Sequence, residues 1–499
     1  MGGFQNFAIS FTIISILAGC LTSYAIAFNQ GGPVAITWGW LIVGLFCTVV
    51  ALALGEIAST YPTAGGLYYW ASKLGSPAWG WFTGWFNLVG QIAVTASIGY
   101  GCAFFSTALL NLLFDYPNSF GWIFFLYGLI MLGAGLINMF KVPITAMLNS
   151  VSAWWHMVGV LIIVGVLIVV PDHHRSVGYV FGQTINNSGF SGNSWTQGVF
   201  IYVFLTGLLM AQYTITGYDA SAHMSEETRQ ASRGAAWGIV MSVVVSVLFG
   251  FILLVAVTFA VPNDKDASGA GLFVVQYIWQ TSMSTRWAEF LLFIAAIAQC
   301  FCTIASVTSA SRMMFAFSRD RAVPGHQFWR RVSKTRVPVY TVWAICVLAF
   351  LLEVPTLSWG YTGYVVSTSV AVIGLYIAFV LPIILRLRAG ERFERGAWHL
   401  GPHYKWIDWL AIIWIFFISI VFLLPFAYAG IPWNTGYNWN LLNYTPITVG
   451  AAFLLFGGWY LLSARDWFKG PIRQGTEEEL ERIEQQYDQP KPGLSPAGR

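Results

Sequence analysis

The chain has 499 residues, of which 57% are hydrophobic, 17% aromatic and only 9% charged. Soluble domains carry roughly 25% charged residues, so this composition excludes a water-soluble globular protein, and a lipid bilayer must cover much of the surface. The 24 Trp residues fit the aromatic belts that form where a membrane meets water. The formal net charge of +4 excludes nothing by itself, because the positions of the charges matter more.

Twelve apolar stretches are long enough to cross a membrane, which takes about 20 residues each. The first stretch is too long for the core of a signal peptide and lacks a basic start, so we expect a spanning helix. The expected spans are residues 4–28, 33–58, 79–113, 120–140, 143–170, 196–220, 234–261, 287–316, 338–353, 361–386, 406–428 and 445–463. We therefore expect an all-α polytopic membrane protein, with a transmembrane domain over residues 1–463 and a cytoplasmic C-terminal tail over residues 464–499.

Loop charge gives an independent test of this span count. If both termini are cytoplasmic, only Arg175, Lys265 and Arg286 of the 25 Lys and Arg residues fall in outer loops. This asymmetry obeys the positive-inside rule, which a wrong span count would scramble. It predicts a multi-pass protein of the plasma membrane with both termini in the cytoplasm. The basic run from Arg312 to Arg336 is then a topogenic inner loop rather than a lipid-binding or nucleic-acid-binding patch.

Two expected spans carry a glycine near the middle of the membrane, followed by small and hydroxylated residues. Span 1 contains Ala18-Gly19-Cys20-Leu21-Thr22-Ser23, and span 6 contains Thr216-Gly217-Tyr218-Asp219-Ala220-Ser221. Interrupted helices at matching places of two halves point to a transporter site, because an unwound turn frees amides and carbonyls for a polar solute. The half-helix beyond the break also directs its positive end at a carboxylate. Alternatively, the glycines only let helices pack closely; the matched pair favours the site.

Three further stretches resemble a known family of permeases. Residues 53–70, in which Glu56-Ile57-Ala58-Ser59 leads through Pro62 and Gly65-Gly66 to Tyr68-Tyr69-Trp70, resemble the signature of the amino acid–polyamine–organocation (APC) superfamily. Residues 217–228 are similar to span 6 of that superfamily, and residues 311–320 with Val323-Pro324 are similar to its inner loop after span 8. That loop, together with residues 14–20, points to the branch of GABA, choline and related amino acid permeases.

The resemblance implies a LeuT-type fold with two inverted repeats, approximately residues 4–170 and 196–386, with discontinuous helices 1 and 6 and two peripheral helices within 406–463. It implies a small-molecule substrate, an amino acid or an amine, cradled at the two breaks. Carbonyls of Tyr213 and Thr214 would meet the amine, and Tyr213 also stands where relatives place an aromatic gate. The amides implied at the carboxylate are those of Ala18, Gly19, Cys20 and Leu21. Relatives often have Gly-Ser-Gly at the first break, so the bulkier Gly-Cys-Leu-Thr of this chain leaves less room there.

Polar and charged groups inside the spans are further candidates for the site. Asp219 follows the second break, where it could carry a coupling proton, meet the substrate amine or cap the resumed helix. Glu56 lies beside a Pro-Gly-Gly turn, which favours a role in a gate and its loop. Asn87 and Gln91 of span 3 either line the cavity or form hydrogen bonds between helices. The expected binding set is completed by Thr22, Thr216 and Gly217.

The coupling ion has two candidate sites. His156 lies deep in span 5, where a lone histidine is often a hydrogen-bonded packing residue. Some family members, however, place a basic residue in span 5 facing the break of span 1, as a substitute for sodium. We therefore hypothesise that His156 carries a coupling proton. The alternative is sodium held by hydroxyls of span 8, among them Thr303 and Ser306. We expect no metal centre and no cofactor other than the coupling ion.

The sequence thus predicts a secondary active transporter, a proton symporter for an amino acid or an amine such as GABA. The alternatives are a sodium-coupled or exchanger-type permease for amino acids, choline or polyamines and, more remotely, a channel or receptor-like membrane protein. The motifs of a membrane enzyme are lacking from the sequence, which has no P-loop, no HExxH and no nucleophile elbow. We therefore do not expect an enzyme.

Overall fold

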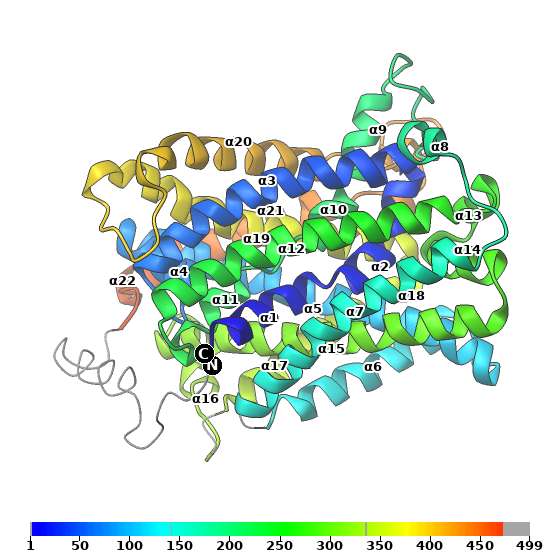
Figure 1. The fold of residues 1–499 in the computed structure, drawn as a ribbon. Helices are drawn as coiled ribbons and strands as arrows, with labels where there is room; N and C mark the ends of the chain where they lie inside the picture. Colours follow the sequence, from blue (N-terminus) through cyan, green and yellow to red (C-terminus); the bar gives the residue numbers. More distant parts are fainter. Residues whose placement is uncertain (1, 141, 335–336, 473–499) are drawn as a thin grey trace.

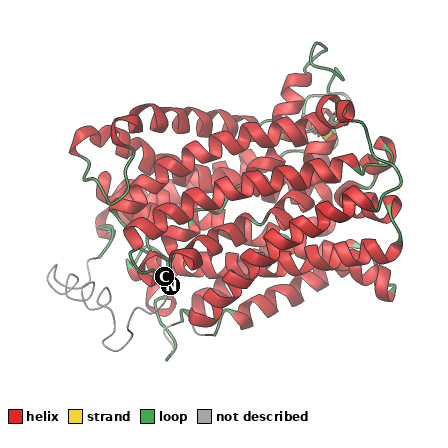
Figure 2. Ribbon diagram, in the orientation of Figure 1, coloured by secondary structure: helices red, strands yellow, loops and turns green. Residues whose placement is uncertain are grey.

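The computed structural model describes residues 2–140, 142–334 and 337–472. Long helices run side by side in one bundle, shown in Figures 1 and 2. One end of the bundle holds α4 (Gly66–Leu74), α16 (His326–Trp329) and α22 (Arg465–Trp467). We call it the basic end, because its loops and helix ends carry Lys73, Arg319, Arg330, Arg388 and Arg465. Lys141, Arg336 and the part of the predicted tail from Arg473 onward lie outside the described residues.

The first predicted span consists of two helices, α1 (Gly3–Ile14) and α2 (Ile16–Asn29). Spans 2 to 5 are α3 (Pro33–Thr60), α5 (Pro77–Phe114), α6 (Phe120–Ile137) and α7 (Val142–Val169). Proline stands at the first position of α3 and α5, where its fixed φ suits a helix start. Beyond α2, the strands β1 (Gln30–Gly31) and β2 (Ile185–Asn186) pair antiparallel, with Gln30 opposite Asn186.

The sixth span is divided into α9 (Phe200–Gly207), α10 (Leu209–Thr214) and α11 (Ala220–His223). Spans 7 to 12 are α12 (Ala231–Phe259), α15 (Thr285–Arg319), α17 (Val339–Leu352), α19 (Tyr361–Ala389), α20 (Tyr404–Leu423) and α21 (Thr445–Trp459). The shorter α-helices are α8 (Val177–Gly182), α13 (Asp264–Gly269), α14 (Val274–Ser282) and α18 (Thr356–Trp359). The remaining turns are η1 (Ser225–Glu227), η2 (Gly271–Phe273), η3 (Gly390–Arg392), η4 (Gly401–His403), η5 (Tyr428–Gly430), η6 (Trp439–Leu441) and the π-helical η7 (Tyr460–Ala464).

The predicted fold class is confirmed. Within the described ranges, 11 helical stretches are long and apolar enough to cross a membrane, and the interrupted sixth span adds the shorter apolar stretch Phe200–Thr214. Helical discontinuities occur in spans 1 and 6, as expected. The most apolar window of span 1 is 100% buried, whereas that of Thr445–Trp467 is only 17% buried. The broken spans therefore form the centre of the bundle, and the last span is left to face lipid.

Candidate substrate site

The break in span 1 lies at Ser15, four residues before the predicted position at Gly19. Ser15 has a left-handed backbone (φ 37°), and its amide donates to the carbonyl of Phe11 at 3.0 Å, which closes α1. Its own carbonyl then accepts from the amides of Ala18 and Gly19, at 2.8 and 2.7 Å. The Ser15 hydroxyl also accepts from the Ala18 amide at 3.2 Å, so this residue ends one helix and caps the next.

This position of the break corrects the expected set of free amides. Ala18, Gly19, Cys20, Leu21 and Thr22 all lie inside α2. A helix leaves its first amides without an intrahelical partner, and the Ser15 cap already occupies that of Ala18. The amides at the open end of α2 are therefore those of Ile16 and Leu17. A serine between isoleucines is an N-cap signal that the glycine-based prediction passed over.

The break in span 6 lies at the predicted glycine. Helix α10 ends at Thr214 and α11 begins at Ala220, with Gly217 between them at φ 79°. A side chain rarely adopts this left-handed conformation, which glycine tolerates without steric cost. The chain there also runs close to α1, because a Cβ on Gly217 would stand 2.4 Å from Cγ2 of Ile13. The two breaks are thus packed against each other.

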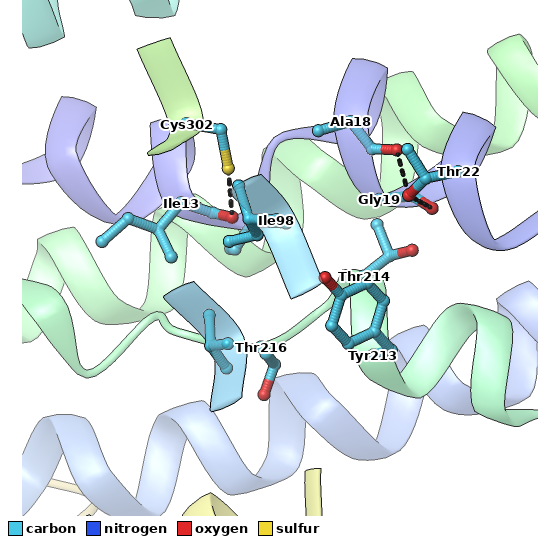
Figure 3. A pocket seen from close by; sticks show the side chains of 11 residues that line it. Ile13, Ala18, Gly19, Thr22, Ile98, Tyr213, Thr214, Thr216 and Cys302 are labelled. Atoms are coloured by element: carbon cyan, nitrogen blue, oxygen red, sulfur yellow. Dashed lines mark hydrogen bonds between the residues drawn. The ribbon is translucent and has the colours of Figure 1, made fainter. Parts of the chain in front are cut away.

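A small cavity lies between the breaks, shown in Figure 3. Six residues of the predicted binding set line it: Ala18, Gly19, Thr22, Tyr213, Thr214 and Thr216. Five further lining residues were not predicted: Ile13, Ile14, Val94, Ile98 and Cys302. The free volume of the cavity is about 10 Å³, which is room for roughly one water molecule. The breaks must therefore separate before an amino acid can enter.

Two tyrosines cover the cavity on the side away from the basic end. The Tyr213 hydroxyl donates to Oγ of Ser97 in α5 at 2.8 Å. The Tyr364 hydroxyl of α19 donates to Oγ1 of Thr22 at 3.0 Å, and the rings of Tyr213 and Tyr364 meet edge to face at 6.4 Å. Thr22 in turn donates to the Ala18 carbonyl at 2.9 Å, which Figure 3 shows. These contacts join the scaffold helices to both broken helices.

The cavity is closed toward the basic end by contacts between α1 and the resumed helix 6. The Ser10 hydroxyl donates to the carbonyl of Tyr218 at 2.8 Å and accepts from the amide of Ser221 at 2.9 Å. The side-chain amide of Asn6 donates to the carbonyl of Ser221 at 3.0 Å. The structure is therefore occluded, with hydrogen-bonded closures on both sides of the breaks.

Three predicted residues gather beside the second break rather than in the cavity. Asp219 Oδ2 accepts from the side-chain amides of Asn87 and Gln91, at 3.3 and 3.1 Å. It also faces Nε2 of His223 at 3.2 Å, and all four side chains are buried. His223 was not singled out from the sequence, although its spacing of four residues from Asp219 places both on one helical face.

His156 lies against the first break. Its Nε2 is 2.6 Å from the hydroxyl oxygen of Ser15, and its Nδ1 is 2.8 Å from the carbonyl of Ser152 on its own helix. Because a carbonyl only accepts, Nδ1 carries a proton, and in the neutral ring Nε2 accepts from the Ser15 hydroxyl. A histidine side chain therefore contacts the residue at which helix 1 is interrupted.

The remaining predicted residues lie away from the cavity. Glu56 Oε2 accepts from Nε of Arg386 at 2.8 Å, and its Oε1 accepts from the amide of Leu400 at 3.0 Å, so it ties α3 to the basic end of α19 and the following loop. In α15, Thr303 donates to a carbonyl of its own helix at 2.9 Å. Ser306 shares a hydrogen bond of 2.7 Å with Thr95 of α5.

Comparison with known proteins accords with this geometry. A family model described as "Amino acid permease" matches residues 1–453. The chain is 36% identical to "Amino-acid permease BAT1" of Arabidopsis thaliana over 489 residues, which cover 94% of this chain and 92% of that protein. It is 37% identical to the homolog of that permease in Oryza sativa subsp. japonica, over 94% of this chain and 91% of the other. It is 27% identical to a "GABA-specific permease" of Saccharomyces cerevisiae, over 95% and 83% of the two chains.

The part of the chain that the structure describes combines 11 apolar helices long enough to cross a membrane with an interrupted sixth span, two facing breaks and an occluded cavity between the breaks. These are the parts of a solute carrier that works by alternating access. The family model covers nearly the whole membrane region, and the relatives named above are permeases rather than enzymes. The chain belongs to the amino acid permease family of multi-pass membrane transporters.

Proposed function

We propose that this protein is a proton-coupled symporter of the plasma membrane, which moves an amino acid or an amine such as GABA. One relative is named for GABA and others for amino acids in general, which supports a substrate with both an amine and a carboxylate. The closed cavity lies between the open end of α2, which attracts an anion, and the carbonyl end of α10, which attracts a cation. A zwitterion of matching length satisfies both ends.

The observation that carries proton coupling is the contact between His156 and Ser15. In the neutral ring, the Ser15 hydroxyl gives its hydrogen to Nε2 and accepts from the Ala18 amide. A proton on Nε2 turns that nitrogen into a donor, so the Ser15 hydroxyl must rotate and donate its hydrogen bond to another acceptor. Protonation of His156 therefore rearranges the hydrogen bonds at the hinge of helix 1, next to the substrate cavity.

Sodium coupling remains the alternative, with a different set of ligands. It would use hydroxyl and carbonyl oxygens between α2 and α15. The hydroxyls of Thr303 and Ser306 already bond to a carbonyl of α15 and to Thr95 of α5. A hydroxyl that donates such a bond keeps its lone pairs for an ion, so neither bond excludes sodium. Only protonation of His156 directly changes the hydrogen bonds of Ser15, the residue at which helix 1 is interrupted, which favours the proton.

The test is uptake of radiolabelled substrates by the purified protein in proteoliposomes. With a panel of amino acids and amines, we expect accumulation driven by an inward proton gradient and unaffected when choline replaces sodium. His156→Asn should abolish accumulation but retain counterflow, because binding of substrate remains. Ser150→Ala, which removes a half-buried hydroxyl bonded within the same helix, serves as the control. Undiminished proton-driven accumulation by His156→Asn would remove the proposed role, and loss of uptake without sodium would favour the alternative.

A further inference from the structure

A histidine on the basic-end side of the second break joins two structural elements. His223, the last residue of α11, is 1% exposed. Its Nε2 lies 3.2 Å from Oδ2 of Asp219, and its Nδ1 lies 3.1 Å from the carbonyl oxygen of Ala64. Ala64 belongs to the loop of residues 61–65 between α3 and α4, which we call the gate loop. The imidazole therefore bridges helix 6 and the gate loop.

The two contacts of this ring indicate which of its nitrogens carry a hydrogen. The carbonyl of Ala64 only accepts, so Nδ1 is a donor. Asp219 Oδ2 already accepts from two side-chain amides, those of Asn87 and Gln91, and acts as a carboxylate oxygen toward Nε2 as well. An unprotonated Nε2 would direct its lone pair at that oxygen. The observed geometry is thus that of a pair with one proton between Nε2 and Oδ2, one more than a neutral ring and a carboxylate hold together.

The gate loop packs against His223. Gly66, just after the loop, has φ 48°, and a Cβ there would stand 3.1 Å from Cε1 and Nδ1 of His223. The amide of Ala64 donates to Oε1 of Glu226 in η1 at 3.1 Å, while its carbonyl accepts from His223. Both polar groups of one residue in the loop are therefore held by the segment that follows the second break. Figure 1 shows α11 near α4 at the basic end.

The charges around the ring leave His223 as the group that changes its hydrogen bonds. On η1, Glu226 lies 3.5 Å from Arg319 and Glu227 lies 3.6 Å from Arg312, so α15 offsets both carboxylates. Helix α5 contributes neutral amides, and α1 carries no titratable residue. Lys73 of α4 and Arg233 of α12 are exposed, while the buried carboxyl of Asp320, directly after α15, lies 4.0 Å from Arg319.

We propose that Asp219 and His223 form a buried proton-binding site that clamps the gate loop to helix 6. With the proton bound, the loop is held and the basic end is closed. When the proton leaves, Nε2 and Asp219 repel each other, the ring turns, and the hydrogen bond to Ala64 is lost. Since the proposed function is proton symport, release of a proton toward the basic end would open the path for the substrate on the same side. The clamp rests on that function, but its effect on the loop is measurable without any substrate.

Amide hydrogen exchange of the gate loop in the purified, substrate-free protein tests the clamp. Rates are corrected for the intrinsic effect of pH on exchange. We expect corrected exchange over residues 61–66 to rise at least tenfold between pH 5.5 and pH 8.5. In His223→Gln it should be independent of pH, because glutamine does not titrate. His399→Gln, which alters an exposed histidine of the basic end, should resemble the wild type.

Several results would overturn the proposal. A flat pH profile in the wild-type protein would do so without any variant, so misfolding of His223→Gln cannot obscure the answer. Persistence of the pH dependence in folded His223→Gln would also overturn it, as would its loss in Glu226→Gln, which would assign the titration to Glu226. Failure of every substrate in the uptake assay would instead count against the symporter function, while a pH-dependent loop would still establish the clamp.

Discussion

Gly19 of α2 and Thr214 of α10 touch across the substrate cavity. A Cβ on Gly19 would stand 2.6 Å from Cγ2 of Thr214 and 2.9 Å from its Cα. Because the second of these atoms belongs to the backbone, no change of rotamer can relieve the contact. The absence of a side chain at Gly19 sets how closely the two broken helices approach each other.

Gly19→Ala should therefore force α2 away from α10 and disturb the cavity from one side. Overpacking of this kind costs about 1–3 kcal/mol, and we expect a lower unfolding temperature together with at least a tenfold loss of substrate uptake. Gly133→Ala is the matched control, since a Cβ at that position of α6 meets nothing within 4 Å. The measurement is thermal unfolding in detergent beside proteoliposome uptake. Equal unfolding temperatures and equal uptake for the two variants would show that the contact at Gly19 relaxes at little cost.

Tyr213 should control closure of the cavity rather than substrate affinity alone. Tyr213→Phe keeps the ring but removes the hydrogen bond to Ser97, worth about 1 kcal/mol. The equilibrium constant for closure should fall roughly fivefold, so we expect the maximal uptake rate to fall by up to a similar factor. Ser97→Ala should have the same effect, and the double variant should be no worse than either single one. Additive losses would show that the two hydroxyls act separately.

The ion pair of Glu56 and Arg386 should determine stability instead of transport specificity. Both side chains are buried, and the guanidinium also lies 3.9 Å from the ring centre of Tyr404. Glu56→Gln leaves a buried charge without its partner, which costs about 3–5 kcal/mol. Glu391→Gln, which alters an exposed carboxylate paired with Arg395 and Lys405 at 3.8 Å, should cost at most about 1 kcal/mol. Thermal unfolding of both variants checks this, and similar shifts would contradict it.

The spans could be predicted from sequence because lipid demands long apolar helices, and their loops obey the charge rule. The second break was located because Gly217 adopts a backbone conformation that favours glycine. The first break was misplaced because Gly19 serves a close contact, whereas Ser15, a residue with a side chain, takes the left-handed conformation. A sequence does not distinguish a glycine needed for its φ from one needed for its size.

The polar cluster at Asp219 could not be predicted from the sequence, for a different reason. Asn87 and Gln91 were expected either to line the cavity or to bond between helices, and the structure places both on Asp219. Whether a polar side chain faces a cavity or a neighbouring helix depends on the rotation of α5 against helix 6. That rotation follows from packing over the whole interface, which no single motif encodes.

The carboxyl group of Asp320 provides a pH-dependent link at the basic end. Asp320 follows the last residue of α15, and its Oδ1 accepts from the amide of Ile472 at 3.0 Å. Burial raises the pKa of this carboxyl to about 7, although the hydrogen bond from Ile472 acts in the opposite direction. The unfolded chain has an ordinary pKa near 3.9, so between about pH 4 and pH 7 the folded protein binds the extra proton. The contribution of Asp320 to stability is therefore greatest below that window, falls as the pH rises through it and is constant above it.

Asp320→Asn should remove this contribution while keeping an oxygen for the Ile472 amide. We expect the unfolding temperature of the wild type, relative to Asp320→Asn, to fall by several degrees between pH 5.5 and pH 8.5. Most of the change should come below pH 7.5, because the carboxyl is largely ionised above it. Asp466→Asn alters an exposed carboxylate of the same end and should show no such trend. Since other groups titrate equally in both proteins, the difference between them isolates Asp320, and a difference that does not vary with pH would mean that this carboxyl is already ionised at pH 5.5.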